Sequence, residues 1–206
     1  MAKYNRKDHL HQRAKKEGLR SRAAYKLKEV QKSSKLLSKG QRVIDLGCWP
    51  GGWLEIAAGL VGKEGRVVGI DRAEVDPEIP LRQVTAIVGD LEDADIVARL
   101  RDSLGAERAD VVLSDAAPKL TGIRETDRAN VERLLETIEQ LLPAILEPGG
   151  AALIKILEGP EAQVVDLRLR KAFDRAKTLK LQSTRKGSSE RYLLARGFHG
   201  EAKGIR

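Results

Sequence analysis

Short apolar runs alternate along the chain with longer segments whose apolar residues recur at helical spacing. Strands of a parallel sheet are apolar along their whole length because helices cover both faces, and the runs at 43–46, 65–71, 84–90, 109–115 and 151–157 have this character. Helical spacing occurs at 21–32, 53–60, 94–104, 127–146 and 161–177. A short edge strand at 179–182 and a closing strand at 191–196 complete a doubly wound α/β pattern.

The helix at 21–32 carries the first candidate functional residue. Ser21 is placed to act as its N-cap, and Ala24, Leu27 and Val30 recur on the side that should face the core. Lys26 lies beside this apolar stripe. Taken by itself, such a lysine is most simply an ordinary surface residue.

A glycine-rich turn follows the first strand. Gly47, Pro50, Gly51 and Gly52 force a sharp bend before a helix that starts at Trp53. The spacing differs from the G-x-G-x-x-G of dinucleotide sites. Asp45 precedes the first glycine by two residues, and an acid there would repel a pyrophosphate but suits an amino group and a sulfonium. The turn therefore favours S-adenosyl-L-methionine over NAD.

Successive strands end in acidic residues. Asp71 ends the second strand, where an acid can accept both ribose hydroxyls of an adenosine. Asp90 ends the third and is placed to accept a hydrogen bond from the adenine amino group. Asp115 ends the fourth, before Ala116-Ala117-Pro118 turns the chain away. These acids are predicted to meet at the carboxyl edge of the sheet, where open α/β sheets bind their ligands.

Lys155 lies inside the apolar run L-I-K-I-L of the fifth strand, where charged residues are rare. A structural explanation would need a carboxylate partner close by. The functional explanation is a lysine held partly out of water so that it can act as a base.

The net charge and the composition indicate which kinds of partner and location to expect. The 206 residues include 38 Lys and Arg against 30 Asp and Glu, a net charge of +8 that favours a polyanionic partner. Much of the excess lies in residues 1–20, a predicted basic arm before a single domain at 21–198 and a tail at 199–206. With one cysteine, no signal peptide and no apolar run of about 18 residues, we expect a cytoplasmic monomer without membrane contact. The three histidines are too scattered to predict a metal site.

The motifs S-R-A-A-Y-K-L, D-L-G-C-W-P-G-G-W, G-I-D, G-D-L, S-D-A-A-P, L-I-K-I and S-S-E-R-Y occur in this order over nearly the whole chain. In this the chain resembles the FtsJ/RrmJ family of ribosomal RNA 2′-O-ribose methyltransferases. The resemblance implies a Rossmann-like class I methyltransferase fold, whose seven-stranded, mostly parallel sheet has an antiparallel last strand. It also implies S-adenosyl-L-methionine as cofactor and, as substrate, a uridine in the A-loop of 23S ribosomal RNA.

The same resemblance implies a catalytic tetrad at Lys26, Asp115, Lys155 and Glu190. Expected cofactor-binding residues, from the resemblance and from the turn itself, are Asp45, Gly47, Gly51, Gly52, Trp53, Asp71, Asp90 and Asp115. One departure from the family pattern is Cys48-Trp49, which stands where Ala-Ala is usual.

Two other kinds of function stay open on the sequence. The chain could be a non-catalytic RNA-binding factor for ribosome assembly, although it keeps all the tetrad residue types. It could also methylate transfer RNA or the messenger RNA cap, which needs the same chemistry. A small-molecule O-methyltransferase would have no use for the basic arm.

Overall fold

The computed structural model describes residues 9–119, 121–157, 160–185 and 187–200. In chain order the elements are α1 (His9–Lys16), α2 (Ala24–Ser34), β1 (Arg42–Leu46), α3 (Gly52–Val61), β2 (Arg66–Asp71), β3 (Val84–Val88), α4 (Ile96–Leu104), β4 (Ala109–Ser114), α5 (Arg124–Ile145), β5 (Leu146–Leu157), α6 (Pro160–Lys171), β6 (Phe173–Leu179) and β7 (Glu190–Phe198).

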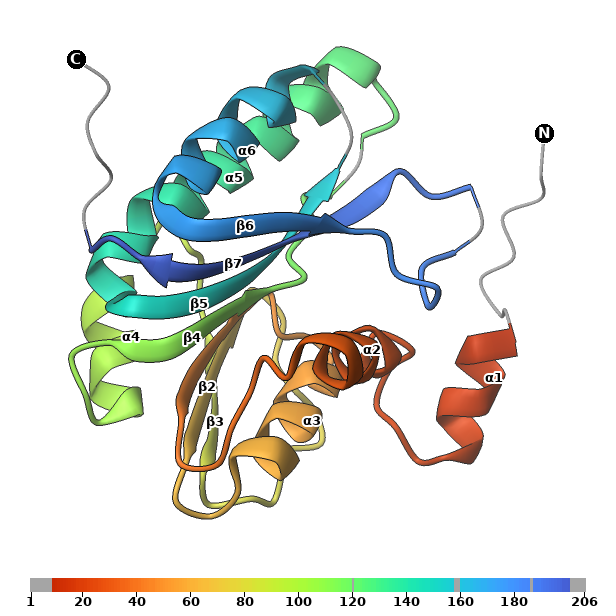
Figure 1. Ribbon diagram of the computed structural model, residues 1–206. Helices are drawn as coiled ribbons and strands as arrows, with labels where there is room; N and C mark the ends of the chain where they lie inside the picture. The colour runs from red at the N-terminus through yellow and green to blue at the C-terminus, as the bar shows by residue number, and fades with distance from the viewer. Residues whose placement is uncertain (1–8, 120, 158–159, 186, 201–206) are drawn as a thin grey trace.

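The strands form one seven-stranded sheet in the order β3-β2-β1-β4-β5-β7-β6 (Figure 1). Strands β1 to β5 pair in parallel, whereas β7 is antiparallel to both β5 and β6. The predicted fold class, including the antiparallel last strand, is confirmed.

Helices cover both faces of the sheet, which explains the apolar strands. Helices α2 and α3 pack on one face, and α4, α5 and α6 pack on the other (Figure 1). Neighbouring residues of a strand point to opposite faces: Val43 packs in the core beneath α2 and α3, and Ile44 packs in the core beneath α4, α5 and α6. Ala24, Leu27 and Val30 of α2 are fully buried, as their spacing predicted.

The predicted N-cap of α2 is wrong. The helix starts at Ala24 with Ala23 in the N-cap position and no side-chain cap hydrogen bond. The Ser21 hydroxyl is buried without a hydrogen-bond partner and lies against the start of α3, where a Cβ on Gly52 would come within 2.3 Å of it. Packing between the two helices, rather than capping, therefore determines how the chain enters α2.

The region after β5 also differs from the prediction. The helix predicted at 161–177 ends at Lys171, and Phe173–Leu179 is strand β6, so the edge strand begins earlier than the predicted 179–182. Antiparallel pairing with β7 and the contact between the Phe173 and Phe198 rings, whose centroids are 5.1 Å apart, hold this segment in the sheet. Tertiary contacts thus outweigh its local helical pattern.

The described part of the predicted basic arm contacts the domain. It contains α1, and Arg20 after it donates to Glu55 of α3 at 2.8 Å and to the Glu78 carbonyl at 3.1 Å. Residues 1–8 of the arm and 201–206 of the tail lie outside the described part of the chain. Among the described helices, none has the length and apolar character needed to cross a membrane.

Candidate active site

A cavity of about 580 Å³ opens at the carboxyl edge of the sheet. This is a usual size for a small-molecule site. Its wall includes Gly47 and the predicted strand-end acids Asp71, Asp90 and Asp115. The sequence reasoning missed the part of the wall that α5 contributes, which includes Asn130, Arg133 and Thr137.

Gly47 brings the turn after β1 against the segment after β4. Its φ is +80°, and a Cβ there would lie 2.6 Å from the Cα of Ala116. Both the backbone conformation and the close approach therefore require glycine. The neighbouring Trp49 N–H donates to the Asp71 carboxylate at 3.0 Å, which fixes the turn to the end of β2. Trp49 itself lines the cavity and is exposed, so it departs from the family pattern at the rim.

Asp90 and Asp71 present carboxylates to the cavity from two neighbouring strand ends. Asp90 pairs with Arg72 at 2.6 Å and accepts the Glu92 N–H at 3.1 Å. The Arg72 side chain is 71% exposed, so this ion pair is weak and leaves Asp90 open to a competing donor.

The other predicted cofactor residues do not line the cavity. Gly51 faces Val75 and Ile79, and Gly52 makes room for Ser21. Trp53 is buried, donates from Nε1 to the Ala23 carbonyl at 2.7 Å and packs with its ring centroid 5.9 Å from that of Tyr192. These three residues pack beneath the glycine turn and contact other parts of the protein, not the cavity.

Asp45 lies in β1 beneath the turn and not on the cavity wall. It is 1% exposed, and neither carboxyl oxygen has a hydrogen-bond partner. Burial, together with the negative charges of Asp115 and Asp71, raises the pKa of Asp45 well above its ordinary value. This differs from the expected exposed anion facing the ligand.

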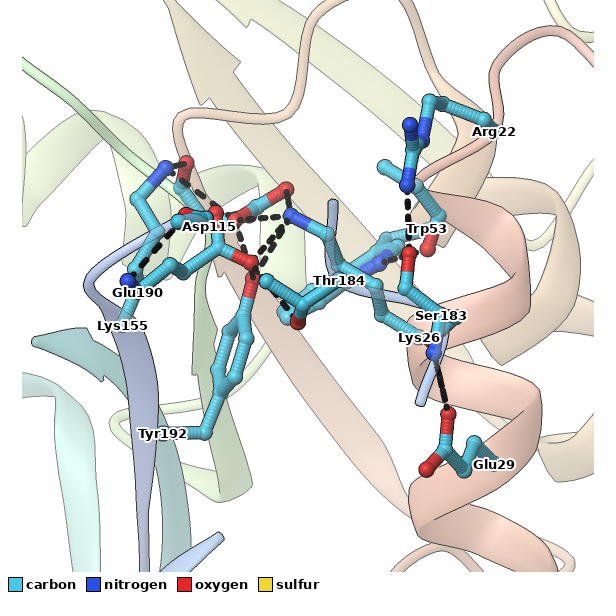
Figure 2. Close-up of polar contacts among 12 residues, drawn as sticks. Arg22, Lys26, Glu29, Trp53, Asp115, Lys155, Ser183, Thr184, Glu190 and Tyr192 are labelled. Atoms are coloured by element: carbon cyan, nitrogen blue, oxygen red, sulfur yellow. Dashed lines mark hydrogen bonds and ion pairs between the residues drawn. The ribbon is translucent and has the colours of Figure 1, made fainter. Parts of the chain in front are cut away.

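The four predicted tetrad residues converge (Figure 2). Asp115 follows β4, Lys155 lies in β5 and Glu190 begins β7, so three neighbouring strands supply them, and α2 adds Lys26. The Lys155 ammonium is 3.1 Å from Asp115 Oδ1, and Lys26 Nζ is 3.3 Å from Asp115 Oδ2 and 2.9 Å from Glu190 Oε1. All four side chains are at most 17% exposed.

Tyr192 is a fifth member that sequence reasoning missed. It is fully buried, and its hydroxyl donates to Asp115 Oδ1 at 2.5 Å and lies 2.9 Å from Lys26 Nζ. Burial and the charges of Asp115 and Glu190 raise the pKa of Tyr192, so it remains a donor. A signal was available: Tyr192 follows Glu190 by two residues and so shares its face of a strand.

Opposing effects act on Asp115. Burial alone would raise its pKa, but Lys155, Lys26 and the Tyr192 hydrogen bond outweigh burial and hold the pKa below its ordinary value. Asp115 therefore stays ionised at neutral pH and can orient both amines.

The two lysines have unequal surroundings. Lys26 lies between two carboxylates and beside the Tyr192 hydroxyl, whereas Lys155 contacts one carboxylate and the main-chain carbonyl of Asp115. Lys26 is therefore paired with more acceptors than Lys155.

Comparison with known families agrees with this geometry. A model described as FtsJ-like methyltransferase matches residues 19–198, which include the glycine turn and every tetrad position. The chain belongs to the FtsJ-like methyltransferase family. The expected family membership is therefore confirmed.

Relatives of this FtsJ-like chain are similar over nearly their full length. Ribosomal RNA large subunit methyltransferase E of Methanothermobacter thermautotrophicus is 43% identical over 198 residues, covering 96% of this chain and 93% of that protein. The protein of the same name from Acidithiobacillus ferrooxidans is 41% identical over 197 residues, covering 96% and 88%.

Two solved structures are similar to this chain in fold. The crystal structure of a ribosomal RNA methyltransferase from Plasmodium falciparum matches with a TM-score of 0.76 and 29% identity, over 88% of this chain and 100% of that one. Aeropyrum pernix fibrillarin, solved with natively bound S-adenosyl-L-methionine, matches at 0.50 with 17% identity over 78% of this chain and 68% of its own, a likeness of fold alone.

The FtsJ-like chain is a methyltransferase that depends on S-adenosyl-L-methionine, as the sequence predicted. Within the described residues, His, Cys, Asp and Glu side chains form no cluster suited to a metal ion.

Proposed function

We propose that this protein methylates the ribose 2′-hydroxyl of a uridine in 23S ribosomal RNA, with Lys155 as the general base. The main observation behind the proposal is that Asp115 both lines the cavity and contacts the two lysines of the tetrad. A methyl donor in the cavity and a hydroxyl beside Lys155 would then meet at one carboxylate. The relatives named above act on ribosomal RNA of the large subunit.

The cavity residues fit the cofactor by their chemistry. Asp71 would accept the ribose hydroxyls and Asp90 the adenine amino group, while the bare backbone at Gly47 allows close approach. Gly51, Gly52 and Trp53 would act through the shape of the turn. Asp45 is buried below that turn without a hydrogen-bond partner and does not line the cavity, so it is not assigned a contact to the cofactor.

The bound cofactor supplies a methyl group activated by a positively charged sulfur. Lys155, in its uncharged form, would take the proton from the 2′-hydroxyl and become an ammonium as the oxygen bonds to the methyl carbon. The carbon–sulfur bond would break at the same time, and its electron pair would stay on the sulfur, which becomes neutral. Asp115 orients Lys155 through Oδ1, and Lys26 and Tyr192 keep Asp115 ionised and fixed. Holding the three reacting atoms in line provides a further large part of the rate.

Basic residues outside the tetrad would hold the RNA by its phosphates. On α6, Arg168 is engaged by Glu139 and Glu136, and Arg170 by Asp166, so these two arginines are locally neutralised. Lys119 and Arg133 are exposed at the cavity and would be better placed. The basic sequence of the arm at 1–20 would add further phosphate contacts. We expect RNA affinity to fall steeply between 50 and 200 mM salt, roughly in proportion to the phosphates contacted; a flat titration would contradict this role.

The deciding experiment is a map of 2′-O-methylation in the host's ribosomal RNA with and without this protein. We expect one uridine of the 23S A-loop to lose its mark, and purified protein to restore it with S-adenosyl-L-methionine. Restoration should fail with a Lys155→Ala variant. An unchanged map, or a lost mark only in transfer RNA or the messenger RNA cap, would overturn the proposal.

A further inference from the structure

A ring of polar contacts joins α2 to the connection between β6 and β7 beside the tetrad (Figure 2). Glu29 lies on α2, one turn after Lys26. Its carboxylate accepts the Gln182 N–H at 2.8 Å through Oε1, and the Ser183 N–H at 3.0 Å and hydroxyl at 2.8 Å through Oε2.

The contacts continue from this connection to the tetrad. Thr184 follows Ser183 and its hydroxyl lies 3.4 Å from Glu190 Oε1. The same Glu190 oxygen is 2.9 Å from Lys26 Nζ, which returns the path to α2. Glu29, Ser183, Thr184, Glu190 and Lys26 thus form a closed ring, which we call the α2 clamp.

The contacts of the α2 clamp fix the position of the connection between β6 and β7 relative to α2. Ser183 is 7% exposed, and charge-assisted hydrogen bonds from backbone donors are among the stronger ones in proteins. Arg22, just before α2, donates to the Ser183 carbonyl. The N–H and the carbonyl of Ser183 are therefore both bound by residues of the segment 22–29. Glu29 touches neither the cavity nor a tetrad side chain, yet it fixes the connection that leads into Glu190.

We propose that Glu29 is a positioning residue for methyl transfer: through the α2 clamp it sets the separation of Lys26 from Glu190, and hence the orientation of Asp115 and Lys155. Without it, the α2 segment and the connection keep only the Arg22 contact to the Ser183 carbonyl and the pair between Lys26 and Glu190. This inference rests on the proposed function, since it assigns the clamp to the same reaction.

The test is the Glu29→Ala variant, assayed for methyl incorporation into ribosomal RNA at saturating RNA, together with calorimetric titration of S-adenosyl-L-methionine and thermal unfolding. We expect kcat to fall on the order of 10- to 100-fold, as a displacement of about 1 Å would cause. Cofactor Kd should stay within about twofold, because the clamp does not line the cavity. Ser183→Ala removes one of the three bonds and should lower kcat less.

Glu139→Ala is the matched control. Like Glu29, the part-buried Glu139 carboxylate of α5 accepts three hydrogen bonds, here all from Arg168 of α6 and far along the chain from the clamp. We expect the kcat of this variant to match wild type at temperatures below unfolding.

Wild-type kcat in Glu29→Ala would overturn the inference. So would equal losses in kcat for the Glu139→Ala control, or a parallel loss of cofactor binding, because these indicate general destabilisation. Failure of the proposed function is a separate result, since wild-type protein itself would then transfer no methyl group to ribosomal RNA.

Discussion

The role of Lys155 can be tested by two substitutions that separate its charge from its ability to act as a base. Arginine keeps a positive charge near Asp115 but does not deprotonate in proteins. Methionine keeps the buried stem and removes the ammonium. If Lys155 takes the 2′-hydroxyl proton, both variants lose the base, although only one of them loses the ion pair.

The expected size of the effect follows from the contacts. General base catalysis contributes about 10²- to 10⁴-fold, which is about 3–5 kcal/mol of transition-state stabilisation. Breaking a buried ion pair costs about 3–5 kcal/mol when a charge is left alone. In Lys155→Met, however, Asp115 keeps Lys26 at 3.3 Å and the Tyr192 hydroxyl at 2.5 Å, so we expect a smaller loss of stability.

The assay is single-turnover transfer of a radiolabelled methyl group to ribosomal RNA, with cofactor binding measured separately. We expect transfer to fall at least 10²-fold in both variants, and cofactor affinity to change little because Lys155 does not line the cavity. A Lys155→Arg enzyme with near-normal turnover would refute the assignment. If only Lys155→Met were slow, the residue would act through its charge and not as a base.

Three further perturbations test the rest of the site. Tyr192→Phe removes a hydroxyl shared by Asp115 and Lys26; it should cost about 1.5–3 kcal/mol of unfolding free energy in urea and lower turnover, and unchanged values would contradict its place in the network. Gly47→Ala puts a Cβ 2.6 Å from the Ala116 backbone at φ +80°, so calorimetry should show weakened cofactor binding, and wild-type affinity would refute the close approach. The raised pKa of Asp45 means that the folded state keeps a proton which the unfolded chain releases near pH 4, so stability should fall as pH rises above that value. Asp45→Asn should remove this fall, and parallel melting-temperature profiles from pH 4 to 8 would argue against it.

Much of the fold could be predicted because buried strands and turns are encoded locally. The apolar runs ending at Asp71 and Asp115 gave strands within two residues of their observed ends, since only a central parallel strand needs apolar side chains on both faces. The region 161–177 could not be assigned in this way. Phe173–Leu179 carries charged residues at helical and at strand spacing alike, and its pairing with β7 decides the outcome.

The site was predicted in part. An unexplained charge within an apolar strand identified Lys155 without any relative, but Lys26 looked like a surface residue, and only the family resemblance placed it in the tetrad. Tyr192 and Glu29 were missed because their partners are distant: Tyr192 meets Asp115 across 77 positions and Glu29 meets Ser183 across 154. Contacts of this range depend on topology, which local patterns do not specify.

The antiparallel direction of β7 is the feature of the topology on which the tetrad depends. Glu190 is the first residue of this nine-residue strand. Because β7 runs opposite to β4 and β5, its beginning lies at the carboxyl edge where those strands end, beside Asp115 and Lys155. In a parallel β7, Glu190 would lie at the opposite edge, about 26 Å away at roughly 3.3 Å per residue. Lys26 would then have lost one of its two carboxylates, and the four tetrad side chains would not meet. The antiparallel direction of β7 is therefore what brings Glu190 beside Lys26 and Asp115.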